Sequence, residues 1–103
     1  MRVLLLPCLL ALAAGTAVAA GREYQPYAGQ PGKDVVWVPT PYPLVEKMLD
    51  MAGVTPGDYV VDLGSGDGRT VITAAKRGAT ALGVEFNPDM VALAEFNAKE
   101  AGV

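Results

Sequence analysis

The chain has 103 residues, 51% of them apolar, and its 8 lysines and arginines are outnumbered by 11 aspartates and glutamates. This length allows at most one small domain. Because the charge is mildly negative and the longest basic run is Lys76-Arg77, the composition argues against a surface that binds nucleic acid. The sequence contains no histidine, which excludes a histidine-ligated metal site and a Ser/His/Asp triad.

The first 20 residues have the pattern of a secretory signal peptide. Arg2 precedes an apolar run from Val3 to Ala14, and small residues with the motif Ala17-Val18-Ala19 follow, as signal peptidase prefers. The apolar run is shorter than the ~20 residues that a membrane-spanning helix needs. Residues 1–20 therefore predict export to a periplasm or to the medium. A membrane anchor, and a misassigned start codon that would leave the protein in the cytoplasm, are the alternatives.

Residues 21–39 predict a flexible lead-in, because they are rich in Gly, Pro, Gln and Tyr and show no apolar period. The one cysteine, Cys8, lies before this segment, so the mature protein is expected to hold no disulfide and no stable membrane span. The first helix is expected to have Thr40 as its cap and Pro41 as its first residue. Apolar residues then recur at helical spacing up to Gly53, namely Leu44, Val45, Met48, Leu49 and Ala52.

Two short apolar segments, over 59–63 and 79–84, predict neighbouring parallel strands. The interior residues Val60 and Val61 of the first are both apolar, which is typical of a strand covered on both faces. A helix over 70–77 connects the two segments. The chain order then calls for a right-handed crossover.

A last helix is expected to follow the second strand. Asn87-Pro88-Asp89 provides a cap, a first-turn proline and a first-turn acid, and Gly102 ends the helix. The predicted fold class is therefore α/β, a Rossmann-like doubly wound parallel sheet truncated to a helix-strand-helix-strand-helix unit.

The turn after the first strand has the composition of a cofactor-binding loop. Its glycines fall at Gly64, Gly66 and Gly68, whereas a dinucleotide fingerprint spaces them as G-x-G-x-x-G and would need a glycine where Arg69 stands. Asp62, two residues before the loop, would repel a pyrophosphate but favour a ligand that carries a sulfonium and an ammonium. The loop therefore favours S-adenosylmethionine over NAD.

Glu85 directly follows the second strand, which the topology places beside the first. Open α/β sheets bind ligands in the crevice at the carboxyl ends of their strands. A carboxylate there can accept hydrogen bonds from both hydroxyls of a ribose. We therefore expect Glu85 to hold the ribose of the cofactor.

These segments, VVDLGSGDGR and ALGVEFNP, resemble the first motif and the acidic second strand of the class I S-adenosylmethionine-dependent methyltransferases. The resemblance implies S-adenosylmethionine as cofactor and methyl transfer by in-line displacement, with residues 40–103 as the N-terminal part of the cofactor-binding domain. It also implies that the residue after the acid packs on adenine. The cofactor-binding positions that it implies are Asp62, Gly64, Ser65, Gly66, Gly68, Glu85 and Phe86. The segment VPTPYPLVEKML is in addition similar to protein lysine methyltransferases of the type that modifies the ATP synthase c-subunit and the adenine nucleotide translocase.

The resemblance does not assign a catalytic residue or the methyl acceptor. A protein or a small molecule is expected as acceptor, without nucleic acid as a partner, and the chain is interpreted as an incomplete domain because the family's sheet has seven strands. Two other functions are compatible with the residues: a noncatalytic exported module that binds a nucleoside or interacts with another chain, and a nicotinamide reductase. Asp67 and Arg69 are expected to form a surface pair, and Trp37 and Tyr42 to belong to the core.

Overall fold

The computed structural model describes residues 24–29 and 36–103. The expected signal peptide over 1–20, and the lead-in residues 21–23 and 30–35, lie outside the described residues. Within the described part, no helix is both long and apolar enough to span a membrane.

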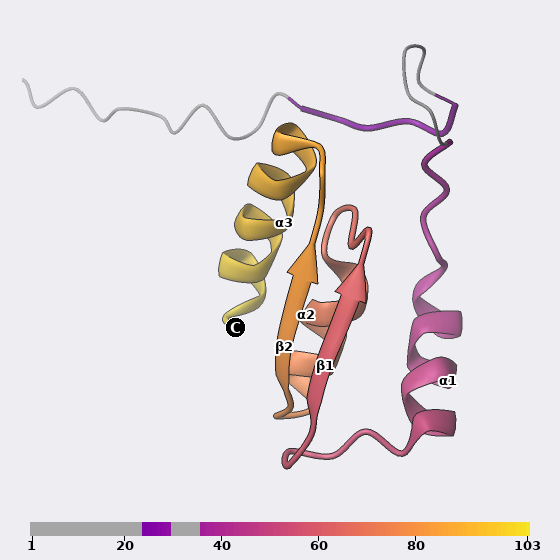
Figure 1. Cartoon of the computed structure of the whole chain (residues 1–103), viewed down its shortest axis with the longest axis vertical. Coiled ribbons are helices and arrows are strands. Elements are labelled where there is room, and N and C mark those ends of the chain that lie inside the picture. The colour runs from indigo at the N-terminus through magenta and orange to yellow at the C-terminus, as the bar shows by residue number, and fades with distance from the viewer. Residues whose placement is uncertain (1–23, 30–35) are drawn as a thin grey trace, which may run out of the picture.

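The described residues form three helices and two strands in the order that the sequence predicts. Their bounds are α1 Tyr42–Ala52, β1 Tyr59–Leu63, α2 Arg69–Lys76, β2 Thr80–Val84 and α3 Pro88–Ala101. The two strands are parallel, with Tyr59 opposite Thr80 and Leu63 opposite Val84. In Figure 1, α2 lies behind the strands and α1 and α3 flank it on either side. The α/β class and the crossover unit are confirmed.

The core lies between the helices and one face of the sheet. Val45 and Leu49 of α1 meet Ala74 of α2, and the half-buried Val60 and Ala81 pack against them from the strands. A small side chain at Ala74 lets the two helices and the sheet come together without a gap for solvent.

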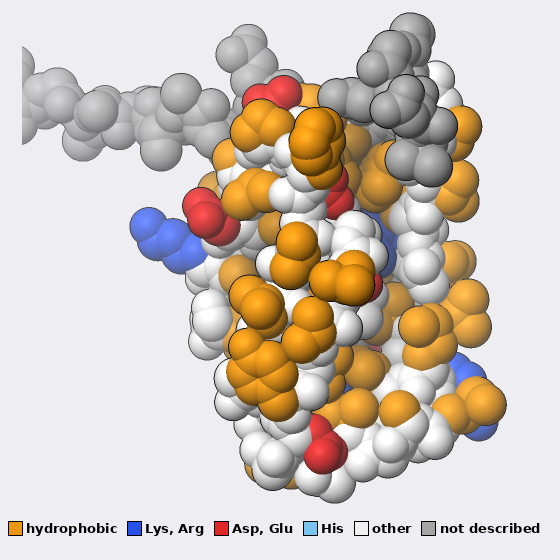
Figure 2. All heavy atoms as spheres, viewed as in Figure 1, with side chains coloured by type: hydrophobic (Ala, Val, Ile, Leu, Met, Phe, Trp, Pro, Cys, Tyr) orange, Lys and Arg blue, Asp and Glu red, His pale blue; other side chains and the backbone are white. Residues whose placement is uncertain are grey.

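The opposite face of the sheet is not covered by the described residues. Val61 is 50% exposed, whereas its neighbour Val60 points to the helices and is half-buried. The expectation that both valines lie in a strand covered on both faces was wrong for Val61, because successive side chains of a strand point to opposite faces. Figure 2 shows hydrophobic side chains gathered over this face. They belong to Tyr59, Val61, Leu63, Leu82 and Val84.

The start of α1 differs from the prediction, while the start of α3 agrees with it. Pro41, not Thr40, is the N-cap of α1, and its carbonyl accepts hydrogen bonds from the backbone of the first turn. The helix begins one residue later than expected because Pro43, rather than Pro41, takes the first-turn position that suits a proline. In α3, the Asn87 side chain accepts a 3.0 Å hydrogen bond from the Asp89 N–H, as the sequence predicts.

Arg77 joins the ends of α1 and α2. Its guanidinium donates to the Asp50 carboxylate at 2.8 Å and to the Glu46 carbonyl at 3.0 Å, and it pairs with the Glu46 carboxylate. These contacts lie on an exposed surface, where ion pairs contribute little to stability. Arg77 therefore connects the two helices at the end of the molecule that is remote from the glycine loop.

The difference between the two faces of the sheet gives a first prediction. Leu49→Ala should lower the free energy of unfolding by about 2–5 kcal/mol, because the leucine is 5% exposed and its loss leaves a cavity. Leu63→Ala is the same chemical change on a side chain that is 79% exposed, and it should change stability by no more than about 0.5 kcal/mol. Urea unfolding of the two variants measures the difference. Equal losses would mean that the strand face is covered in solution.

Candidate cofactor site at the glycine loop

The loop over 64–68 connects the carboxyl end of β1 to the first turn of α2. Gly64, Gly66 and Gly68 have φ angles of +81°, +54° and +82°, a region in which other residues are strained. The loop is fixed to the second strand because the N–H groups of Gly64 and Ser65 donate to the Val84 carbonyl at 2.7 and 3.0 Å. The glycines are thus required by the backbone path itself.

The three glycines also have different surroundings. A methyl group at Gly64 would meet no atom within 4 Å, so this side of the backbone is open. A methyl group at Gly66 would lie 2.8 Å from Nε1 of Trp37, and one at Gly68 would lie 3.0 Å from Cβ of Ala94 in α3. Gly66 and Gly68 therefore let other segments approach the loop, while Gly64 leaves space for a ligand.

Glu85 binds the loop through its carboxylate. One oxygen accepts from the Gly66 N–H and the other from the Asn87 N–H, both at 2.9 Å. The structure therefore brings the acid after β2 together with the glycine loop, as the sequence predicts. Each carboxylate oxygen can accept more than one hydrogen bond, so these contacts leave capacity for a ribose hydroxyl. The ribose role of Glu85 stays a prediction.

Asp62 and Phe86 lie at the ends of the two strands. Asp62 is half-buried on the helix-facing side of β1, opposite Gly83 in the strand register. The Phe86 side chain is 100% exposed. An open backbone at Gly64, two acids and an exposed aromatic ring fit a nucleoside that carries positive charge and no phosphate. Contact of these residues with a cofactor stays a prediction.

Ser65 is held by a residue that the sequence analysis did not single out. The Ser65 side chain is buried over Gly83 of β2, where a methyl group would lie 2.6 Å from Oγ of Ser65. Gly83 is therefore needed so that the loop can lie close to the strand. A glycine inside an apolar strand is the signal that could have identified it, because such a glycine often marks a close approach of backbone.

Asp67 and Arg69 form a pair, but they are not on the surface as expected. Nε and Nη2 of Arg69 donate to the two Asp67 oxygens at 2.9 and 2.6 Å. The side chain of Arg69 is only 17% exposed and that of Asp67 only 13%. The reason is that α1 and the segment before it cover the pair. Nη1 of Arg69 donates to the Thr40 carbonyl at 2.8 Å, and the guanidinium lies 5.1 Å from the centre of the Tyr42 ring. The hydrogen bond to Asp67 raises the pKa of Arg69 further above its usual range, against the opposing effect of burial.

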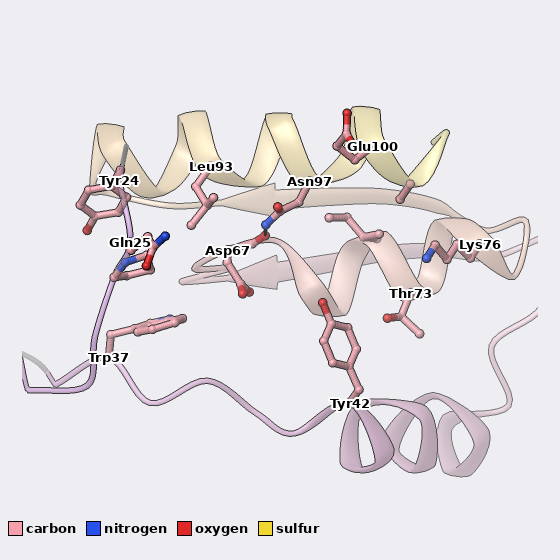
Figure 3. A pocket seen from close by; sticks show the side chains of 13 residues that line it. Tyr24, Gln25, Trp37, Tyr42, Asp67, Thr73, Lys76, Leu93, Asn97 and Glu100 are labelled. Carbon is pink, nitrogen blue, oxygen red and sulfur yellow. Dashed lines mark hydrogen bonds between the residues drawn. The ribbon is translucent and has the colours of Figure 1, made fainter. Parts of the chain in front are cut away.

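A cavity of about 600 Å³ lies behind the loop, among the three helices and residues 24–26. Figure 3 shows Trp37 and Tyr24 at one end and Lys76 at the other. Part of its polar lining is occupied by contacts within the protein: Asn97 donates to the Asp67 carbonyl at 3.0 Å, and Thr73 donates to the Arg69 carbonyl at 2.7 Å. Residues 62–66, 85 and 86 do not line the cavity. The open side of the loop, and not this cavity, is therefore the candidate cofactor site.

Comparison with known families gives a match over most of the chain. A family model described as "Histone methylation protein DOT1" matches residues 16–102. This range includes the glycine loop, Glu85 and most of the described structure.

Individual relatives agree with this match. A protein-lysine N-methyltransferase of Saccharolobus islandicus is 46% identical over 71 residues, which cover 67% of this chain and 44% of that protein. The human lysine N-methyltransferase of the ATP synthase c-subunit is 38% identical over 97 residues, which cover 92% of this chain and 41% of that protein. The chain thus spans less than half the length of these relatives.

Solved structures show the same likeness. An RNA methyltransferase from Salinibacter ruber in complex with S-adenosyl-L-homocysteine is 57% identical, with a TM-score of 0.63, over 64% of this chain and 44% of that protein. YjhP from E. coli is 30% identical with a TM-score of 0.59, over 64% of this chain and 27% of that protein. Because one of these neighbours is an RNA methyltransferase, the expectation that nucleic acid is not a partner has no support.

The contact between Ser65 and Gly83 gives a prediction that can be tested by stability. Gly83→Ala should destabilise the protein by about 1–3 kcal/mol, because the new methyl group has no space beside Ser65. Gly57→Ala is the control, since a methyl group there meets only Oγ1 of Thr55 at 3.9 Å. This variant should stay within about 0.5 kcal/mol of the parent in thermal or urea unfolding.

A double variant checks the cause of the loss. Ser65→Gly in the Gly83→Ala protein removes the clashing side chain, so the two changes together should cost less than the sum of the single changes. Simple addition of the two costs would contradict the close approach of Ser65 to the second strand.

Proposed function

The chain belongs to the family of the histone methylation protein DOT1, among the class I S-adenosylmethionine-dependent methyltransferases, and on this premise we propose that its glycine loop binds S-adenosylmethionine for methyl transfer. The observation that carries the proposal is the contact between the glycine loop and the acid after β2. Glu85 accepts a hydrogen bond from the Gly66 N–H, beside the open backbone of Gly64. This arrangement places an acid next to backbone that a ligand can reach.

Each predicted residue has a proposed task. Gly64 offers exposed backbone at the open side of the loop. Ser65 packs the loop onto β2 beneath the cofactor, while Gly66 and Gly68 fix the path of the loop. Asp62 and Glu85 supply negative charge, which favours the sulfonium and ammonium groups of the cofactor. Glu85 in addition accepts from ribose hydroxyls, and Phe86 packs on the adenine ring.

The cofactor, when bound, supplies an activated methyl group that an acceptor nucleophile displaces from sulfur. The protein contributes position and exclusion of water. In the described residues, the site is built at the carboxyl ends of β1 and β2, and one face of these strands is uncovered. We therefore propose that further protein elements close the acceptor side of the site in the active enzyme.

Binding of the cofactor can be tested on Phe86, whose side chain is fully exposed. Phe86→Ala should weaken binding of S-adenosylhomocysteine by roughly 10- to 100-fold, because stacking on a base is worth about 1–3 kcal/mol. Its melting temperature should not change. Glu85→Ala should weaken binding at least as much and also lower stability, because two backbone N–H groups lose their acceptor. Isothermal titration calorimetry and thermal unfolding measure both effects.

The matched control is Glu95→Ala, which removes an exposed acid of α3 outside the candidate site. It should bind S-adenosylhomocysteine like the parent. Equal affinities for the parent, Phe86→Ala and Glu85→Ala would contradict the proposed site. Binding of NADH in preference to S-adenosylhomocysteine would contradict the proposed cofactor.

For the acceptor we propose a lysine side chain of a protein. Support comes from the names of the relatives, since the Saccharolobus and human proteins are both lysine N-methyltransferases and the human one aligns with 92% of this chain. The Salinibacter neighbour, an RNA methyltransferase, makes RNA the competing acceptor.

A transfer assay separates the two acceptors. With S-adenosylmethionine labelled in the methyl group, label should enter lysines of a mixture of basic proteins and not RNA. Turnover should lie well below the ~1–10³ s⁻¹ of typical enzymes, because an open acceptor side does not orient the nucleophile. Label in RNA alone would contradict the lysine assignment. No label in either would mean that this chain binds the cofactor without transferring its methyl group.

A further inference from the structure

The segment before α1 lies directly against the glycine loop. Trp37 contacts Gly66 so closely that a methyl group on this glycine would lie 2.8 Å from the indole Nε1 and 3.5 Å from Cδ1. Gly66 is also the residue whose N–H is held by Glu85. An aromatic side chain from outside the loop therefore packs on the same residue to which the acid of the candidate site binds. We call residues 36–40 the strap.

Arg69 connects the strap to the loop by three kinds of contact. It donates twice to the carboxylate of Asp67 in the loop, and once, over 2.8 Å, to the carbonyl of Thr40 in the strap. Its guanidinium also lies 5.1 Å from the centre of the Tyr42 ring at the start of α1. Because the donors of a guanidinium are fixed in one plane, these contacts set the position of the strap relative to the loop.

The loop side of this connection is itself held in place. Asn97 of α3 donates to the Asp67 carbonyl at 3.0 Å, and Asp67 also accepts from the Arg69 N–H at 3.3 Å. The loop residue to which Arg69 binds is thus held by α3, and Arg69 in turn binds the Thr40 carbonyl. A change at Arg69 should release the strap while the loop keeps its other contacts.

We propose that Arg69 is a positioning residue for the cofactor site, and that it acts by holding Trp37 against Gly66. The proposal rests on the proposed function, because it assigns the strap a part in cofactor binding. With Trp37 in place, Gly66 keeps the conformation in which its N–H meets Glu85. Without it, the loop would have to order itself when the cofactor binds, and affinity would fall by the cost of that ordering.

The sequence supplies its own probe for this proposal, since Trp37 is the single tryptophan of the chain. Its fluorescence reports the packing of the strap without any label. In the full chain without ligand, Arg69→Ala and Arg69→Lys should both shift the Trp37 emission to longer wavelength, as the indole becomes more hydrated. The lysine of Arg69→Lys should not restore the Trp37 emission of the parent, because one ammonium cannot bind both the Asp67 carboxylate and the Thr40 carbonyl.

Arg77→Ala is the matched control. Arg77, at the end of α2, also donates several hydrogen bonds to α1, but its partners are Glu46 and Asp50, far from the loop. This variant can lower the melting temperature slightly, yet it should leave the Trp37 emission and the affinity for S-adenosylhomocysteine unchanged. An emission shift of the same size in Arg77→Ala would overturn the proposal, because it would reflect general loosening.

Calorimetry with S-adenosylhomocysteine tests the link to the site. Arg69→Ala and Trp37→Ala should each weaken binding by about tenfold, and the double variant should also lose about tenfold rather than a hundredfold, because both changes remove one interaction. Multiplication of the two losses would show that Arg69 does not act through Trp37. Unchanged emission and unchanged affinity in both Arg69 variants would likewise overturn the proposal.

The result also separates this proposal from the proposed function. If the parent protein failed to bind S-adenosylhomocysteine, the proposed function would fail. If the parent bound it and the Arg69 variants bound it equally, only the positioning role would fail.

Discussion

The structure depends on the absence of side chains at a few points of the loop between β1 and α2. Gly66 admits the indole of Trp37, and Gly68 admits α3 so closely that its Cβ position would lie 3.4 Å from the Cα of Ala94. Gly83, in the neighbouring strand, admits the side chain of Ser65. Three segments that are distant in the chain therefore converge on one stretch of backbone. A side chain at any of these glycines would separate them.

Glu85 places a negative charge at a fixed position beside the packed loop. Its two oxygens bind the loop at Gly66 and the start of the α3 cap at Asn87, so one carboxylate joins the end of the second strand to both neighbouring turns. The bonds to backbone N–H groups hold the carboxylate in place. Since the negative charge is fixed beside the open backbone of Gly64, a cationic nucleoside can be favoured without a rearrangement of the loop.

The sequence was sufficient for the features that depend on local pattern. The order of elements, the cap at Asn87 and the proximity of Glu85 to the glycine loop all followed from turn residues and strand ends. Contacts between distant segments were not predictable in the same way. Neither the packing of Trp37 on Gly66 nor the bond from Arg69 to Thr40 has a local signal, because each joins residues about 30 positions apart. Thr40 is the clearest case, since its pattern indicated a helix cap while its carbonyl serves Arg69.

The two valines of β1 show how far the pattern of a single segment predicts the surroundings of a strand. An apolar pair inside a strand is typical of a sheet with both faces covered, and here only the face of Val60 meets helices of the described chain. The face of Val61 presents five neighbouring apolar side chains to solvent, which soluble proteins rarely leave exposed as one patch. The relatives are more than twice as long as their matches to this chain. The composition of β1 is thus typical of a strand that is covered on both faces, including the face that the described residues leave exposed.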